Sequence, residues 1–303
     1  MMLTRRAILG ACSLAPFGLA AARGQDLGPA GPVARRVASL DLLLTETLLT
    51  LSLVPAAVGN IPLYQRLVAE PELPDDVPDL GPLQEPNLEL LQYLRPDLVL
   101  APSWAAAGQR DLERIAPVAW LPTFSTEKPA LDHARSLLAQ VAAMTGRDAE
   151  AQAWSGRADA ALAEARQALA PFADRPVYVV RFMEDGRHAA IFGGNGMIGD
   201  VLARLGLTNA WTGRTNVWGT TSIGIEQLAG NPEARLIHFN RGAETDRALR
   251  QLAGSPLWQA LPAVRQGRVI ETPVVYPNGG LSSAARFAGQ LAQAVPAHEA
   301  ARG

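Results

Sequence analysis

The four histidines of this 303-residue chain are its most versatile chemical groups, because an imidazole can bind a metal or transfer a proton. They are His133, His188, His238 and His298, and they show no metal-binding spacing such as HExxH. His238 lies in the apolar stretch ARLIHF, where a hydrogen-bonded core histidine is expected. The spacing predicts neither a metal bound by the protein nor a catalytic histidine.

Other motifs typical of enzymes are absent from the sequence or have a structural explanation. There is no G-x-S-x-G nucleophile elbow. The GGNG stretch at 193–196 lacks the Gly-Lys-Ser/Thr ending and the G-x-G-x-x-G spacing of phosphate-binding loops, so a plain turn is predicted. Ser282 and Ser283 have no base nearby in the sequence, and helix capping accounts for them. We therefore expect a protein that binds a ligand and is not an enzyme.

Four aromatic residues favour a binding site. Trp211 and Trp218 lie among Thr, Asn and Gly in NAWTGRTNVWGTTSIGIEQLAG, whereas Trp104 and Tyr276 each follow an apolar strand pattern. Aromatic rings in polar loops at strand ends suit a large, partly apolar ligand. We expect Trp218 to contact that ligand and Trp211 to pack against the segment before it.

The stretch 147–169 is predicted to be a long helix that holds these loops in place. Trp154, Ala158, Leu162, Ala165 and Leu169 recur at spacings of four and three, which is one face of an α-helix. At ~1.5 Å per residue such a helix is about 35 Å long. About a hundred residues of mixed patterning lie on each side, so we interpret the helix as a strut between two lobes.

Strand and helix patterns alternate on both sides of this helix. Strands are predicted at 36–40, 54–59, 97–101, 118–121, 176–183, 189–192, 234–239 and 268–272. Helices are predicted at 41–53, 87–93, 111–115, 131–145, 197–205, 246–253, 257–260 and 282–295, with another around 226–228. This alternation predicts mostly parallel sheets covered by helices, with ligands beyond the carboxyl ends of the strands. The expected fold is α/β, with two Rossmann-like lobes and a ligand cleft between them.

The N-terminus resembles an export signal. Arg5 and Arg6 precede an apolar run at 7–22 that ends in small residues, as in a secretory signal of the twin-arginine type. Alternatives are a lipoprotein box ending at Cys12, a membrane anchor or a buried helix. The predicted organisation is a signal peptide at 1–24, a first lobe at 25–142, an interlobe helix at 143–172 and a second lobe at 173–303. The net charge of −2 does not suggest a nucleic-acid partner.

Several stretches resemble one family over about residues 36–291. They are AEPELP (69–74), EPNLELL (85–91), RIAP (114–117), NAWTGRTNVWGTTSIGIEQLA (209–229) and SPLWQALPAVRQGR (255–268). They resemble the periplasmic iron(III)-hydroxamate siderophore-binding proteins of ABC importers, the FhuD type. The resemblance implies two α/β lobes joined by one long helix. It also implies a periplasmic monomer that delivers an iron(III)–siderophore to an inner-membrane permease and its ATPase. The siderophore encloses the iron, so no cofactor and no protein ligand to iron are implied.

The resemblance assigns ligand contacts unevenly between the lobes. In the second lobe, Trp218 and Tyr276 match aromatic contacts, and Asn278 stands where the family has a tyrosine. In the first lobe the family's arginine aligns with Leu83, which is followed by Gln84. The other contacts of that lobe align with Ala105, next to Trp104, and with Leu67, near Tyr64. Arg181 is either a replacement cation from the second lobe or part of a surface ion pair.

The sequence also suggests two acidic residues for docking to the permease, and it leaves other ligands and other classes of protein open. Glu89 and Glu226 resemble the acids that dock this superfamily onto its permease, although acids near helix N-termini are also common. The identity of the siderophore stays open, because the arginine of the first lobe is replaced. Another iron chelate, haem or a corrinoid is an alternative ligand. An exported α/β enzyme and a subunit of a signalling system are alternative classes.

Overall fold

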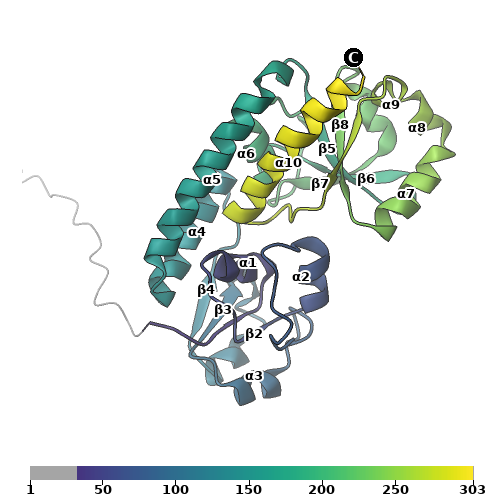
Figure 1. The fold of residues 1–303 in the computed structure, drawn as a ribbon. Helices are drawn as coiled ribbons and strands as arrows, with labels where there is room; N and C mark the ends of the chain where they lie inside the picture. The colour runs from purple at the N-terminus through teal and green to yellow at the C-terminus, as the bar shows by residue number, and fades with distance from the viewer. Residues whose placement is uncertain (1–32, 303) are drawn as a thin grey trace, which may run out of the picture. The chain divides into compact units, whose positions relative to one another are not determined.

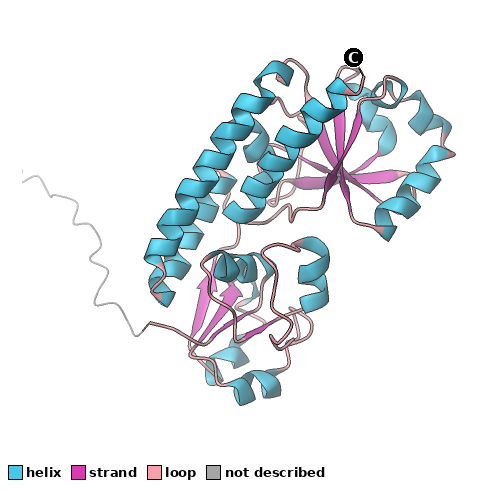
Figure 2. Cartoon of the chain, viewed as in Figure 1, coloured by secondary structure: helices cyan, strands magenta, loops and turns pink. Residues whose placement is uncertain are grey.

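The computed structural model describes residues 33–302, which form two α/β lobes (Figure 1). The first lobe is built on a four-stranded sheet and the second on a five-stranded sheet, as Figure 2 shows. This confirms the predicted fold class. The predicted signal peptide, with Arg5, Arg6 and Cys12, lies outside the described residues. No helix within 33–302 is long and apolar enough to cross a bilayer.

The strands of the first sheet all run parallel, in the order β2-β1-β3-β4. They are β1 (Val37–Ser39), β2 (Ala57–Val58), β3 (Leu98–Pro102) and β4 (Val118–Leu121). Each overlaps a strand predicted from the sequence. Their short apolar runs without alternation are typical of strands that are covered on both faces.

Polar side chains at the N-cap positions explain where helices of the first lobe begin. Asp41 accepts hydrogen bonds from the amides of Leu43 and Leu44, and Asn87 accepts one from Leu90. The helices are α1 (Leu42–Thr50), α2 (Ile61–Leu67) and α3 (Leu88–Leu94), with 3-10 turns at Ser103–Ala105 and Arg110–Arg114. The sequence analysis missed α2, which buries only Tyr64 and therefore shows no apolar periodicity.

The second sheet has the strand order β7-β6-β5-β8-β9. It consists of β5 (Val177–Phe182), β6 (His188–Phe192), β7 (Thr220–Gly224), β8 (Arg235–Asn240) and β9 (Val269–Pro273). Strands β5, β8 and β9 run parallel, whereas β6 pairs antiparallel with both of its neighbours, β5 and β7. The sequence analysis treated β7 as loop, because this edge strand reads TTSIG and buries only Ile223.

The helices of the second lobe surround this sheet. They are α6 (Met197–Arg204), α7 (Ala243–Ala253), α8 (Pro256–Ala260), α9 (Pro262–Arg265) and α10 (Leu281–Ala300). Residues Ile225–Gly230 form a 3-10 helix in place of the predicted α-helical segment around 226–228. A further 3-10 turn, Ala170–Phe172, follows the connecting helices.

Two long helices, α4 (Ala130–Thr145) and α5 (Asp148–Leu169), connect the sheets and lie side by side in Figure 1. Helix α5 occupies the range predicted for the strut, and Ala158, Leu162 and Leu169 on its predicted face are buried. Gly146 adopts a φ of 65° and separates the two helices, since this left-handed conformation ends α4. The sequence analysis expected one interlobe helix, whereas α4 runs beside it and α10 packs against it.

Helix α4 illustrates how closely the lobes are joined. The sequence analysis assigned most of it to the first lobe, but its first turn also contacts α6 of the second lobe. The amide of Leu131 donates to Asp200, at 2.8 Å, and Arg204 forms an ion pair with Asp132, at 2.7 Å. The N-terminus of the connecting segment is therefore fixed to the second lobe by polar contacts.

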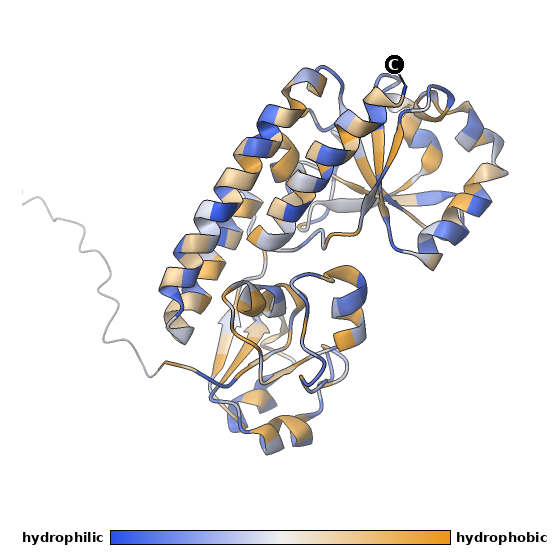
Figure 3. Ribbon diagram, in the orientation of Figure 1, coloured by the Kyte–Doolittle hydropathy of each residue, from blue (hydrophilic) through white to orange (hydrophobic). Residues whose placement is uncertain are grey.

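One hydrophobic core runs through both lobes. Leu44 and Leu48 of α1 belong to the same buried cluster as Leu137 of α4, Leu162 of α5 and Phe287 of α10. Figure 3 shows this pattern as apolar strands and inner helix faces with polar residues on the outer helix faces. Because close-packed interiors resist deformation, this shared core limits the movement of one lobe against the other.

A carboxylate of the first lobe caps a helix of the second. Glu46 of α1 is fully buried and accepts hydrogen bonds from the amides of Gly280 and Ser283, at 3.2 and 2.8 Å. The Ser283 hydroxyl donates to the same carboxylate, at 3.0 Å. The expectation that Ser282 and Ser283 cap α10 is therefore wrong, because the acceptor at this helix N-terminus is Glu46.

Candidate functional site

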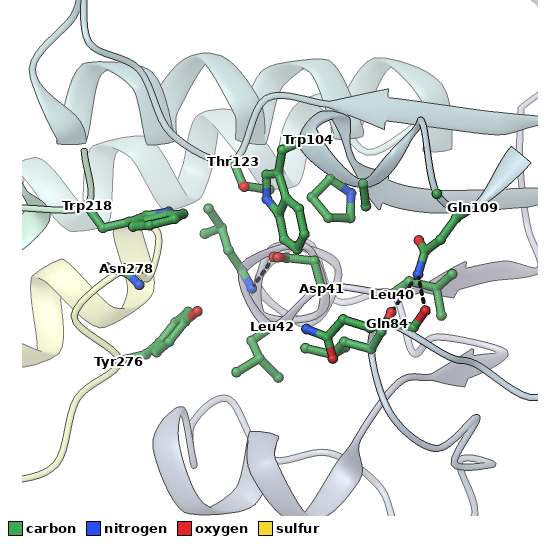
Figure 4. A pocket seen from close by; sticks show the side chains of 15 residues that line it. Leu40, Asp41, Leu42, Gln84, Trp104, Gln109, Thr123, Trp218, Tyr276 and Asn278 are labelled. Atoms are coloured by element: carbon green, nitrogen blue, oxygen red, sulfur yellow. Dashed lines mark hydrogen bonds between the residues drawn. The ribbon is translucent and has the colours of Figure 1, made fainter. Parts of the chain in front are cut away.

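A cavity of about 410 Å³ lies between the two lobes at the carboxyl ends of several strands (Figure 4). Loops after β1, β3 and β4 supply its first-lobe wall, and the loops before β7 and after β9 supply its second-lobe wall. This position agrees with the general rule that ligands of α/β proteins bind beyond the carboxyl ends of the strands. The lining residues are Leu40, Asp41, Leu42, Leu43, Leu83, Gln84, Pro102, Trp104, Ala105, Gly108, Gln109, Thr123, Trp218, Tyr276 and Asn278. We call this space the aromatic cavity.

Trp218 is held in place by its own loop and by the first lobe. Its amide donates to the Asn216 side chain, at 3.0 Å, and the amide of Thr220 donates to the same oxygen, at 3.2 Å. Phe124 of the first lobe contacts the indole ring edge-on, with 5.6 Å between ring centroids. The indole remains 41% exposed, so a face is available to a ligand.

The next residue, Gly219, allows this loop to approach the turn before α6. Its φ is 74°, and a Cβ there would lie 2.4 Å from the backbone of Gly196. Gly219 therefore satisfies both a left-handed backbone and a close contact. Residues 193–196 form a turn, as the sequence predicts, and this turn packs against Gly219 in the Trp218 loop.

Tyr276 and Asn278 come from the segment between β9 and α10. Tyr276 is half-buried and packs against the shared core, while its hydroxyl end points into the aromatic cavity in Figure 4. Burial raises the pKa of Tyr276 above its ordinary value, so the phenol stays protonated and can donate a hydrogen bond. The amide side chain of Asn278 adds a further donor and acceptor beside Trp218.

The first-lobe wall places an exposed ring opposite these residues. Trp104 follows β3 directly and is 52% exposed. The side chain of Gln109 donates to the carbonyls of Leu83 and Gln84, at 2.8 and 3.2 Å, and thereby fixes the loop that contains these two residues. Most side chains of this wall are apolar or aromatic, and Asp41 is the one ionisable residue among the described residues that form it.

Asp41 contributes a carboxylate to the cavity. It is the second residue after β1, and its side chain accepts the two amide hydrogen bonds that begin α1. Burial raises the pKa of Asp41 to about 6, although those two hydrogen bonds act in the opposite direction. Asp41 is therefore both a helix cap and a titratable group in the cavity wall.

The structure brings together five of the seven residues predicted to bind ligand. These five are Trp218, Tyr276, Asn278, Trp104 and Gln84. Tyr64 lies elsewhere, because it is buried in the first-lobe core and its hydroxyl donates to the Pro71 carbonyl, at 2.7 Å. Arg181 lines an adjoining cavity instead of this one.

The sequence analysis missed Asp41, Gln109 and Thr123. Asp41 and Thr123 both follow strands that the sequence predicts, so a systematic search of strand ends would have found them. Gln109 lies between two short 3-10 turns in GQRDLER, and no sequence pattern distinguishes it. Trp211 lies outside the aromatic cavity, as expected, and packs partly buried against the core of the second sheet.

Neither the proposed docking acids nor the four histidines are among the residues that line the aromatic cavity. Glu89 in the first turn of α3 and Glu226 in the 3-10 helix after β7 are both exposed. His238 is buried beside Phe182, and burial lowers its pKa. Within residues 33–302, no three His, Cys, Asp or Glu residues come close enough together to hold a metal ion.

Comparisons with known proteins identify relatives along almost the whole chain. A sequence model of the periplasmic binding protein family matches residues 37–276. The iron(3+)-hydroxamate-binding protein FhuD of Escherichia coli K12 is 31% identical over 296 residues, which cover 97% of each chain. The structure of the Fe3+–Desferal-bound siderophore-binding protein FhuD of Vibrio cholerae has a TM-score of 0.78 and 28% identity, covering 87% of this chain and 98% of that one. The petrobactin-binding protein YclQ of Bacillus subtilis shares the fold, with a TM-score of 0.69, 20% identity and coverage of 86% and 91%.

Proposed function

The chain belongs to the periplasmic binding protein family, and we propose that it captures an iron(III)–siderophore complex of the hydroxamate type. It delivers this complex to an inner-membrane ABC permease and its ATPase. The protein acts in the periplasm, as a monomer and not as an enzyme. The alignment with a hydroxamate-binding relative over 97% of both chains supports this assignment.

The observation that carries the proposal is the aromatic cavity between the lobes. Trp218 and Tyr276 of the second lobe face Trp104 of the first across a space of about 410 Å³. Aromatic faces bind the apolar backbone of a wrapped chelate, and Gln84, Asn278 and the Tyr276 hydroxyl supply hydrogen bonds to its polar groups.

Iron reaches this site already enclosed by the oxygens of the siderophore, and the protein contributes no iron ligand. Among the described residues that line the cavity, Asp41 supplies the one carboxylate. Removing the siderophore should then remove the iron as well. Stoichiometric iron in chelator-free protein would contradict this part of the proposal.

A fluorescence titration tests the binding function. Iron(III)–desferrioxamine should quench the tryptophan emission in a saturable manner, because Trp104 and Trp218 line the cavity. Trp218→Phe should lose a large part of the quenching, whereas the matched variant Trp211→Phe should retain it. Saturable binding of haem or a corrinoid, with no response to iron–hydroxamates, would replace the proposed ligand class.

We also propose that Arg5 and Arg6 direct export through the twin-arginine pathway. A double substitution of both arginines by lysine should leave the precursor in the cytoplasm. Fractionation of cells followed by immunoblotting measures this directly. Normal periplasmic yield in that variant, or in cells without the twin-arginine translocase, would refute the assigned pathway.

A further inference from the structure

A second cavity, of about 350 Å³, adjoins the aromatic cavity. The two spaces share Tyr276 and Asn278 as lining residues, so a single ligand can contact both. Three arginines, Arg66, Arg181 and Arg241, line the second cavity, and none of the described residues in its walls is acidic. We call this space the arginine compartment.

The arginines come from both lobes. Arg66 lies on α2 of the first lobe, whereas Arg181 lies near the carboxyl end of β5 and Arg241 directly follows β8. Strands β5 and β8 are parallel neighbours in the sheet, which places Arg181 and Arg241 at the same edge. That edge is where ligands of α/β sheets bind.

The guanidinium groups are only partly neutralised. Glu244 forms ion pairs with both Arg66 and Arg241, at 3.3 and 3.1 Å. The other acid near Arg241 is Glu184, which already forms a two-pronged pair with Arg247, at 2.7 and 3.1 Å. Arg181 makes no ion pair or side-chain hydrogen bond with any residue in 33–302. Three positive charges are thus opposed by one directly paired carboxylate.

Arg241 is the most constrained of the three. Its side chain is only 7% exposed, and its buried Nε has no hydrogen-bond partner among the described residues. The pKa of the Arg241 guanidinium is lowered mainly by burial, and the positive charges of Arg181 and Arg66 lower it further. A buried charge without full compensation is costly unless a partner supplies opposite charge.

From this geometry we propose that the arginine compartment binds a carboxylate of the ligand, so that the cargo is an anionic iron(III) chelate with a free carboxyl group. The planar guanidinium fork matches a carboxylate in geometry as well as charge. This inference rests on the proposed siderophore function and specifies the chemical class of the ligand. It also gives Arg181 a role different from that of a cation in the aromatic cavity.

A matched pair of chelates tests the proposal. Both chelates are iron(III)–desferrioxamine acylated on its terminal amine. One carries an acetyl cap, which is neutral, and the other carries a succinyl cap, which ends in a carboxylate. The wild-type protein should bind the succinylated complex roughly 10- to 100-fold more tightly by calorimetry, as expected for a charge-assisted contact. Arg181→Gln should bring this preference close to one while leaving the affinity for the acetylated complex within about threefold.

Control variants keep the result interpretable. Arg250→Gln removes the same charge from an exposed position on α7 that lines neither cavity, and it should retain the full preference. Arg66→Gln, at an exposed residue, provides a second test should Arg181→Gln fail to fold. Equal wild-type affinity for the two chelates, or an equal loss of both in Arg181→Gln, would overturn the inference. Absence of binding to either chelate would instead refute the proposed siderophore function.

Discussion

Trp218 is the single side chain on which ligand affinity should depend most. Its loop is fixed by Asn216 and Gly219, while the ring itself contacts Phe124 edge-on. A large aromatic anchor at a binding hot spot contributes ~2–4 kcal/mol, so Trp218→Ala should weaken ligand binding by roughly one to three orders of magnitude. Calorimetric titration with an iron–hydroxamate measures the loss.

Trp211→Ala is the matched control and should show the opposite pattern. Its ring packs over Gly213 and Gly193 against the core of the second sheet, so its removal leaves a void. The affinity should stay within a few-fold, whereas the thermal melting temperature should fall by several degrees. A Trp218→Ala protein that binds normally, or that loses stability as Trp211→Ala does, would place the ligand outside the aromatic cavity.

The carboxylate of Asp41 should make stability depend on pH. Its pKa is raised to about 6 from an ordinary value of 3.8, so the folded protein holds this proton over a range where the unfolded chain has lost it. The free energy of unfolding should therefore fall as the pH rises from about 4 to about 6 on account of this group, and then stay level.

Asp41→Asn should remove this dependence and keep the helix cap, because an asparagine oxygen can accept the same amide hydrogen bonds. Relative to wild type, the variant should gain stability between about pH 4 and 6 and keep that gain at higher pH. Urea unfolding across this range gives the comparison, with Asp76→Asn as an exposed control. A constant difference between Asp41→Asn and wild type at all pH values would show that Asp41 does not titrate in this window.

Sequence reasoning identified residues that line the cavity best where one residue follows a recognisable strand. Trp104 and Tyr276 were identified in this way, and the structure places both in the aromatic cavity. Tyr64 was misplaced, because proximity in sequence to an aligned position says nothing about the direction of a side chain. Its position on α2, which the sequence analysis missed, turns the ring into the first-lobe core.

The N-terminus of helix α10 should owe much of its stability to Glu46. Glu46→Ala leaves the buried amides of Gly280 and Ser283 without an acceptor and opens a small void, which should cost about 2–4 kcal/mol in the free energy of unfolding. Glu46→Gln retains an acceptor and should cost clearly less. Chemical denaturation of both variants measures the difference, and equal stability of Glu46→Ala and wild type would exclude this capping role.

Secondary elements with strong periodicity were predicted well, and weak ones were missed. The helix at 147–169 repeats apolar residues on one face, and α5 buries that face against α10. Strand β7 and helix α2 each bury a single residue, so neither leaves an apolar pattern in the sequence. The cap at α10 joins residues more than two hundred positions apart, and local sequence carries no trace of such a pair.

Across the whole molecule, Glu89 and Glu226 should serve transport without affecting capture. Both are exposed, lie on different lobes and are absent from the lining of the aromatic cavity. A double substitution by alanine should preserve siderophore affinity within about threefold and should lower iron uptake by cells. Uptake of radioactive iron–siderophore together with calorimetry separates the two effects. A large loss of affinity would assign these residues to folding or to the ligand site.

The core that runs through both lobes has a kinetic consequence. Separating the lobes would expose Leu44 of α1 and Phe287 of α10 to water, which is unfavourable in proportion to the apolar area uncovered. The residence time of the bound ligand should then depend on the side chains of the cavity walls. The dissociation rate of the ligand should change far more on substitution of Trp218 than on a change in solvent viscosity. In the proposed transport role, release of the ligand should therefore require displacement of the Trp218 loop from Phe124.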